Sequence, residues 1–147
     1  MSVTFVTGDA FEAENQAIAL GLNAAGRLGV SALHTRLLDR YPVFASSFHR
    51  QGRAGQLVPG AYFIWRESDP WLVALIVRET LQGAIRPRFV EAALLSLARD
   101  WQREGLRQLA LDQFTDASDA AEWPTLREII HHYLKPLDLP VTVYESA

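Results

Sequence analysis

The sequence at residues 3–29 is VTFVTGDAFEAENQAIALGLNAAGRLG. It begins with a short β-branched and aromatic run that stops at Thr7-Gly8-Asp9, which predicts a strand followed by a turn. The continuous apolar run at 17–22 predicts a second strand, buried on both faces, and Asn23-Ala24-Ala25-Gly26 follows it. Two strands that each open into a polar turn containing glycine are the layout of a pocket for a nucleotide diphosphate.

Predicted helices and strands alternate along the rest of the chain. Helices are expected at 30–41, from Pro42, from Pro87 and from Thr125, where Thr125 and Glu128 form a capping-box pattern. Strands are expected at 61–65 and 71–77, paired as a hairpin, and at 108–111 and 141–144. This order predicts an α/β fold of three layers, α/β/α, around a central mixed, mostly parallel sheet. At 147 residues, we expect a single domain spanning 1–147.

The composition is that of an ordinary soluble domain and excludes several kinds of chemistry. Apolar residues make up 49% and charged residues 21%, and the net charge of −3 provides no basic field for nucleic acid or membrane. The absence of cysteine excludes disulfides, thiolate metal sites and a cysteine nucleophile. The N-terminal residues lack signal-peptide features, and no apolar run approaches the roughly 20 residues of a membrane span. We therefore expect a cytoplasmic protein.

The order of the motifs resembles that of a macro domain, the module that binds ADP-ribose. The likeness rests on Gly8-Asp9, on 23–26, on 29–34 as a shortened glycine-rich phosphate loop, and on VTVYE at 141–145. The pattern is closest to the branch that acts on ADP-ribosylated DNA and acidic side chains. The resemblance implies that Asp9 accepts a hydrogen bond from adenine, that the loop from Gly26 to Gly29 holds the proximal phosphate, and that Asn23 lies beside the distal ribose.

The chain departs from the family at both phosphate loops. Hydrolase members carry an aspartate or lysine in the first loop, where this chain has Val30 and Ser31. The second loop is normally rich in glycine, but 112–123 contains none and adds Asp116 and Asp119, whose charges would repel a diphosphate. We therefore expect altered or weakened affinity and no usual catalytic side chain, with Asn23 as the remaining catalytic candidate.

The predicted ligand-contacting residues lie in four segments. Arg78 and Arg86 belong to the segment between a strand and a helix, where ligands gather in α/β folds, and arginine suits phosphate. The full set is Asp9, Asn23, Ala24, Gly26, Gly29, Val30, Ser31, Arg78, Arg86, Phe114 and Thr115. Several of these also have structural alternatives, with Asp9 as a helix N-cap and the glycines as left-handed backbone.

No metal site or cofactor is predicted. Asp112, Asp116, Asp119 and Glu122 could gather around a hard cation, but they do not have EF-hand spacing, and a solvated acidic loop is the favoured interpretation. The adjacent histidines His131 and His132 point to different helix faces and make a poor metal pair.

Three functional hypotheses remain open. The first is a module that binds ADP-ribose, a related nucleotide or an ADP-ribosylated macromolecule. The second is a pseudo-macro domain whose acidic loop binds a basic protein partner or whose pocket takes a different ligand. The third is an ADP-ribosyl glycohydrolase acting on ADP-ribosylated DNA or protein.

Overall fold

The computed structural model of the chain describes residues 2–115 and 119–146. Its centre is a six-stranded sheet in the order β1-β6-β5-β2-β4-β3. All neighbouring strands are parallel except β3, which pairs antiparallel with β4 as the predicted hairpin. The strands are β1 (Val3–Thr7), β2 (Ala17–Asn23), β3 (Tyr62–Trp65), β4 (Trp71–Arg78), β5 (Leu109–Asp112) and β6 (Val141–Glu145).

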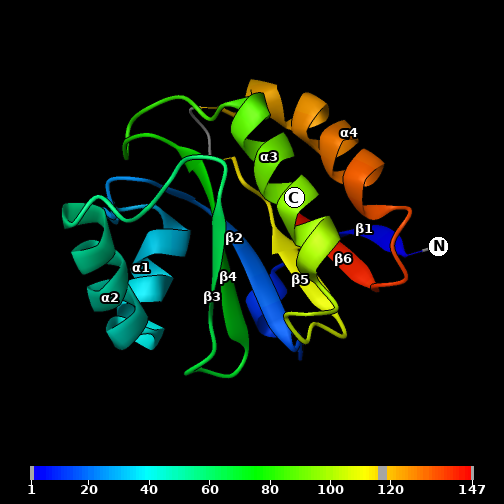
Figure 1. The fold of residues 1–147 in the computed structure, drawn as a ribbon, viewed down its shortest axis with the longest axis horizontal. Coiled ribbons are helices and arrows are strands. Elements are labelled where there is room, and N and C mark those ends of the chain that lie inside the picture. Colours follow the sequence, from blue (N-terminus) through cyan, green and yellow to red (C-terminus); the bar gives the residue numbers. More distant parts are fainter. Residues whose placement is uncertain (1, 116–118, 147) are drawn as a thin grey trace.

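Helices cover both faces of the sheet, so the fold has the three predicted layers. Figure 1 shows α1 (Ala32–Arg40) and α2 (Pro42–Arg53) on one side, with α3 (Pro87–Asp100) and α4 (Trp123–Leu134) on the other. Two short 3-10 helices, η1 (Ala10–Glu12) and η2 (Ala120–Glu122), follow β1 and precede α4. No helix in the described part of the chain is long and apolar enough to cross a membrane.

The core has two halves that meet at β2. Ile18, Leu20 and Leu22 point into the half under α1 and α2, whereas Ala17 and Ala19 point into the half under α3 and α4. The alternation follows from the two-residue period of a strand, and burial of both faces explains why this run reads as continuously apolar.

Two predicted helix starts differ from the structure. The helix predicted at 30–41 begins at Ala32, because Ser31 caps it by accepting a hydrogen bond from the His34 N–H. The capping box at Thr125 and Glu128 is wrong: α4 begins at Trp123 and has no side-chain cap. The 3-10 turn η2 runs directly into the helix, and a proline fits the first helical turn, so Thr125 lies inside the helix.

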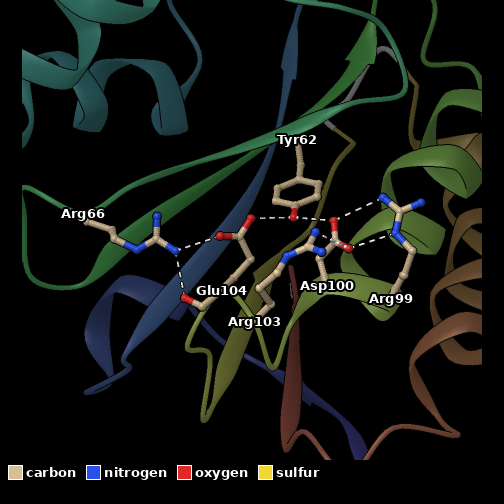
Figure 2. A network of polar contacts seen from close by, with 6 residues as sticks. All are labelled: Tyr62, Arg66, Arg99, Asp100, Arg103 and Glu104. Atoms are coloured by element: carbon tan, nitrogen blue, oxygen red, sulfur yellow. Dashed lines mark hydrogen bonds and ion pairs between the residues drawn. The ribbon is translucent and has the colours of Figure 1, made fainter.

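A polar network joins the edge strand β3 to the end of α3 (Figure 2). The Tyr62 hydroxyl lies 2.9 Å from Oδ2 of Asp100 and 2.6 Å from Oε2 of Glu104. Arg99 and Arg103 pair with Asp100, which is buried, and Arg66 pairs with Glu104. The network therefore fixes the edge strand against α3 through charge-assisted hydrogen bonds.

Candidate functional site

Three of the predicted site residues lie at one edge of the sheet, where the five parallel strands end, together with Asp112. Asp9 follows β1, Asn23 ends β2, Arg78 ends β4 and Asp112 ends β5. The carboxyl ends of parallel strands are where open α/β sheets bind ligands. The chemistry of this edge depends on what each polar side chain already contacts.

Asp9 is half-buried and already carries two donors. Its Oδ1 accepts a hydrogen bond from the Phe11 N–H at 2.9 Å and from Nη1 of Arg36 at 2.7 Å. The Arg36 guanidinium also lies over the Phe11 ring, 4.8 Å from its centroid. Burial alone would raise the pKa of Asp9, but the hydrogen bonds from Phe11 and Arg36 together lower it below its ordinary value. Asp9 is therefore both the predicted N-cap, of η1, and an ion-paired carboxylate.

Asp112 is a second carboxyl beside Asp9. Alternation along β5 places its side chain on the same face as Ala110, under α1 and α2. Its carboxyl group makes no hydrogen bond to another residue of the described part. Burial, assisted by the Asp9 carboxylate and opposed by Arg36, raises the pKa of Asp112 to about 7. This carboxyl therefore keeps its proton to a much higher pH than an ordinary aspartate does.

The buried Asn23 side chain holds the first loop in place by hydrogen bonds to its backbone. It is 1% exposed, and its amide group donates to the Arg27 carbonyl at 2.9 Å and accepts from the Arg27 N–H at 3.2 Å. The next residue, Ala24, donates its N–H to the Arg78 carbonyl at 2.9 Å. Asn23 thus closes the turn 23–27 and ties its start to the end of β4.

Gly26 is required by close packing as well as by its backbone angle. Its φ is +68°, and a Cβ at this position would lie 2.5 Å from the Phe48 carbonyl oxygen. A Cβ on Gly52 of α2 would lie 2.2 Å from the Ala25 carbonyl oxygen. The first loop therefore lies directly on the backbone of α2, at a distance that only two glycines permit.

The rest of the first loop forms hydrogen bonds with the start of α1. The Gly29 N–H donates to Nδ1 of His34 at 2.8 Å, and Ser31 is the N-cap of the helix. Val30 between them is 98% exposed. The hydroxyl of Ser31 and the N–H of Gly29 thus have protein partners, while Val30 projects into solvent.

Arg78 joins three segments at the end of β4. Its Nη1 donates to the Gly83 carbonyl at 3.1 Å, and its Nη2 donates to the Phe114 carbonyl at 3.3 Å. Nη2 also forms an ion pair with Oδ2 of Asp119, and the two side chains are only 14% and 11% exposed. Asp119 is therefore a neutralised partner of Arg78, in contrast to the repulsive free carboxylate expected from the sequence.

The remaining predicted contacts differ in position. Phe114 is 5% exposed and packs on Gly21, under α3 and α4, so its ring is a core side chain. Thr115 is half-buried and accepts from Nε2 of Gln113 at 2.9 Å. Arg86 is exposed at the N-cap of α3, and Asp116 lies outside the described residues.

Trp123 anchors the end of the second loop. Its Nε1 donates to Oε2 of Glu145 at 2.8 Å, and Arg127 pairs with the same oxygen at 3.0 Å. The hydrogen bond from Trp123 opposes the effect of burial and, with Arg127, lowers the pKa of Glu145. The start of α4 is thereby fixed to the end of β6.

Two shallow surface depressions are lined, apart from Arg36, by other residues. One, of about 420 Å³, runs along α1 and is lined by Ala32, Thr35, Arg36, Asp39 and Arg40. The other, of about 360 Å³, lies between α3 and α4. Neither is lined by a residue that the sequence predicted to contact a ligand.

Solved structures show what this arrangement is. The chain superposes on the macrodomain of Thermus aquaticus DarG with a TM-score of 0.86 and 22% identity, covering 97% of both chains. The chain has the macrodomain fold. Thermosipho africanus DarTG in complex with ADP-ribose gives a TM-score of 0.89 at 20% identity, with 99% of this chain and 42% of that one covered. The macrodomain of Mycobacterium tuberculosis DarG gives 0.88 at 16% identity, covering 99% and 98%.

Sequence comparisons give weaker relationships. No protein-family model matches the chain. It is 20% identical, over an alignment of 162 residues, to a DNA ADP-ribosyl transferase-DNA ADP-ribosyl glycohydrolase fusion protein of Thermosipho africanus. The alignment includes 97% of this chain, which spans 42% of the length of that curated relative.

Sequence reasoning missed two charged residues of this edge. Arg36 contacts Asp9 from 27 residues away, and no local pattern connects them. Asp112 was considered only as part of an acidic loop, although it directly follows an apolar strand, as Asn23 does. A polar residue at the end of a buried strand was therefore a signal that could have identified Asp112, as it identified Asn23.

Proposed function

We propose that this macrodomain binds ADP-ribose, free or attached to a macromolecule, at the carboxyl edge of its sheet. The observation that carries the proposal is the gathering of Asp9, Asn23 and Arg78 at that edge. Asp9 and Asn23 stand there in the chain order of the family resemblance, and Arg78 ends the neighbouring strand β4. A complex of one fold relative with ADP-ribose supports the choice of ligand.

Each residue has a role that its geometry allows. The Asp9 carboxylate has about four acceptor sites, so it can accept an adenine amino group beside the Phe11 and Arg36 donors. The loop from Gly26 to Gly29 would face the proximal phosphate, and Asn23 would support the distal ribose. Arg78 would supply positive charge near the phosphates.

We further propose that the affinity is lower than that of a pocket with free donors. Asp9 is paired with Arg36, the Gly29 N–H with His34, and Arg78 with Asp119. A ligand must exchange with these partners, so each contact it gains replaces one that the protein already makes. The net gain per contact is correspondingly small.

Calorimetric titration with ADP-ribose tests the proposal. Wild-type chain should bind, and Asp9→Asn should weaken binding by about tenfold, because the charged acceptor is lost while the N-cap oxygen is kept. The matched control is Glu14→Gln, an exposed change in the same connection. Neither heat nor a melting shift at millimolar ADP-ribose would overturn the proposal.

A second candidate is removal of ADP-ribose from DNA or protein. It is favoured by the resemblance, over nearly the whole chain, to a fusion protein named for DNA ADP-ribosyl glycohydrolase activity. Incubation with ADP-ribosylated DNA and with ADP-ribosylated protein at high enzyme excess decides it, since full retention of the label on both excludes the activity. Of the side chains predicted from sequence, Asn23 stays the catalytic candidate.

Three narrower statements stay predictions. They are a single domain over 1–147, a cytoplasmic location and a basic protein partner for the acidic loop. The partner hypothesis loses one of its charges, because Asp119 is neutralised by Arg78.

A further inference from the structure

We propose that Arg78 is an anion-binding residue and that the Asp119 carboxylate occupies it as an internal substitute for a ligand phosphate. The identity of the ligand rests on the proposed function. The occupation of Arg78 by the Asp119 carboxylate, called masking below, is a property of the protein alone and can be tested with a simple anion.

The Arg78 guanidinium is held in position independently of Asp119. Carbonyl oxygens of Gly83 and Phe114 accept from its two terminal nitrogens, from the β4–α3 connection and the segment after β5. The backbone carbonyl of Arg78 is bonded in turn to the Ala24 N–H. The cation is therefore fixed in place by groups that carry no charge and that would remain if the carboxylate left.

The ion pair lies in a mostly dry environment. Side-chain exposures of 14% for Arg78 and 11% for Asp119 leave little room for water to replace the carboxylate. Removing one partner of such a pair leaves an uncompensated cation, which is strongly unfavourable unless another anion takes the position. A guanidinium fork binds phosphate in the same geometry as carboxylate, so the two anions can exchange.

The position of the pair fits the diphosphate pocket that the sequence predicts. Arg78 is the register partner of Asn23 on β2, and Asn23 opens the first loop. An anion on Arg78 would thus lie between the first loop and the segment that follows β5. These two segments are the predicted walls of the diphosphate pocket.

Titration with inorganic pyrophosphate tests the proposal on four chains: wild type, Asp119→Asn, the Asp119→Asn and Arg78→Gln double variant, and Arg88→Gln as an exposed-arginine control. Asp119→Asn should bind pyrophosphate about 10–100-fold more tightly than wild type, because the competing carboxylate is gone. The double variant should lose that gain, and Arg88→Gln should bind as wild type does. A folded Asp119→Asn that binds no more tightly than wild type overturns the proposal.

A second measurement covers the case in which Asp119→Asn does not fold. In the wild-type chain, the side-chain nitrogen resonances of Arg78, assigned with Arg78→Lys, should move as pyrophosphate is added. Resonances unchanged at saturating pyrophosphate overturn the proposal. ADP-ribose binding without the pyrophosphate gain would leave the proposed function standing and reject the masking. The reverse result would reject ADP-ribose as ligand and keep the masked anion site.

Discussion

Arg36 and Asp9 form an ion pair 2.7 Å long across 27 residues of sequence, on the side of the pocket predicted to hold adenine. In this pair the predicted ligand contact is the anion, Asp9. In the pair of Arg78 and Asp119, at the other end of the edge, the predicted ligand contact is the cation. Both ends of the candidate site are thus neutralised by side chains of the protein itself. Ligand binding should therefore respond to changes in these partners as well as to changes in the contact residues.

Arg36→Gln should increase affinity for ADP-ribose by about three- to tenfold, because it frees the Asp9 carboxylate from a charged donor. Calorimetric titration measures the change, and Arg53→Gln on α2 is the exposed control. A fall in affinity would contradict the prediction and would place Arg36 in contact with the ligand.

Asp112→Asn should stabilise the protein clearly more at pH 8 than at pH 5. The folded-state pKa of about 7 is above the ordinary carboxyl value, so the folded state binds the proton more tightly than the unfolded state does. The associated stability is present at low pH and is lost as pH rises towards 7. Asparagine resembles the neutral acid, so it should gain about 1–3 kcal/mol at pH 8.

Urea unfolding at both pH values measures this effect, with the exposed Asp138→Asn as the matched change. An equal gain at pH 5 and pH 8 would show that the effect does not come from ionisation of Asp112.

Gly26→Ala should destabilise the fold by more than about 2 kcal/mol. The new Cβ would combine a left-handed backbone with a 2.5 Å approach to the Phe48 carbonyl oxygen. Gly55→Ala is a close control, since its φ of +70° is similar and nothing lies within 4 Å of the added carbon. It should cost only about 1–2 kcal/mol, and equal losses in the two variants would refute the packing argument.

Tyr62→Phe should lower the free energy of unfolding by about 1–3 kcal/mol, because the hydroxyl bridges two carboxylates in the network of Figure 2. Burial and those carboxylates raise the pKa of Tyr62, so it stays a donor. Denaturant unfolding measures the loss, with Tyr133→Phe as the control variant. Equal free energies of unfolding for the two variants would mean that Asp100 and Glu104 need no hydrogen-bond donor here.

The fold was predictable because its signals are local. Pro42 and Pro87 begin α2 and α3 as expected, and the apolar run at 17–22 is the central strand. The capping signature at Thr125 failed because the preceding 3-10 turn starts the helix two residues earlier. Local sequence patterns therefore located the elements better than their first residues.

The candidate edge was predictable, but its internal charge pairs were not. Positions after β1, β2 and β4 identified Asp9, Asn23 and Arg78, because strand ends meet in a parallel sheet. Arg36 and Asp119 reach them from 27 and 41 residues away, through tertiary packing that no spacing rule encodes. The sequence thus predicted the candidate edge, and the structure added the ion pairs that Asp9 and Arg78 form there.

The most direct test of ADP-ribose binding at this edge is a titration followed by the backbone amide resonances of the ¹⁵N-labelled chain. We expect the amide resonances of Phe11, Ala24, Gly29 and Arg78 to shift together and to saturate at one ligand per chain. The amide resonances of β3, the strand at the lateral edge of the sheet, should not shift. No shift at millimolar ADP-ribose, or shifts confined to residues away from the strand ends, would contradict ADP-ribose binding at this edge.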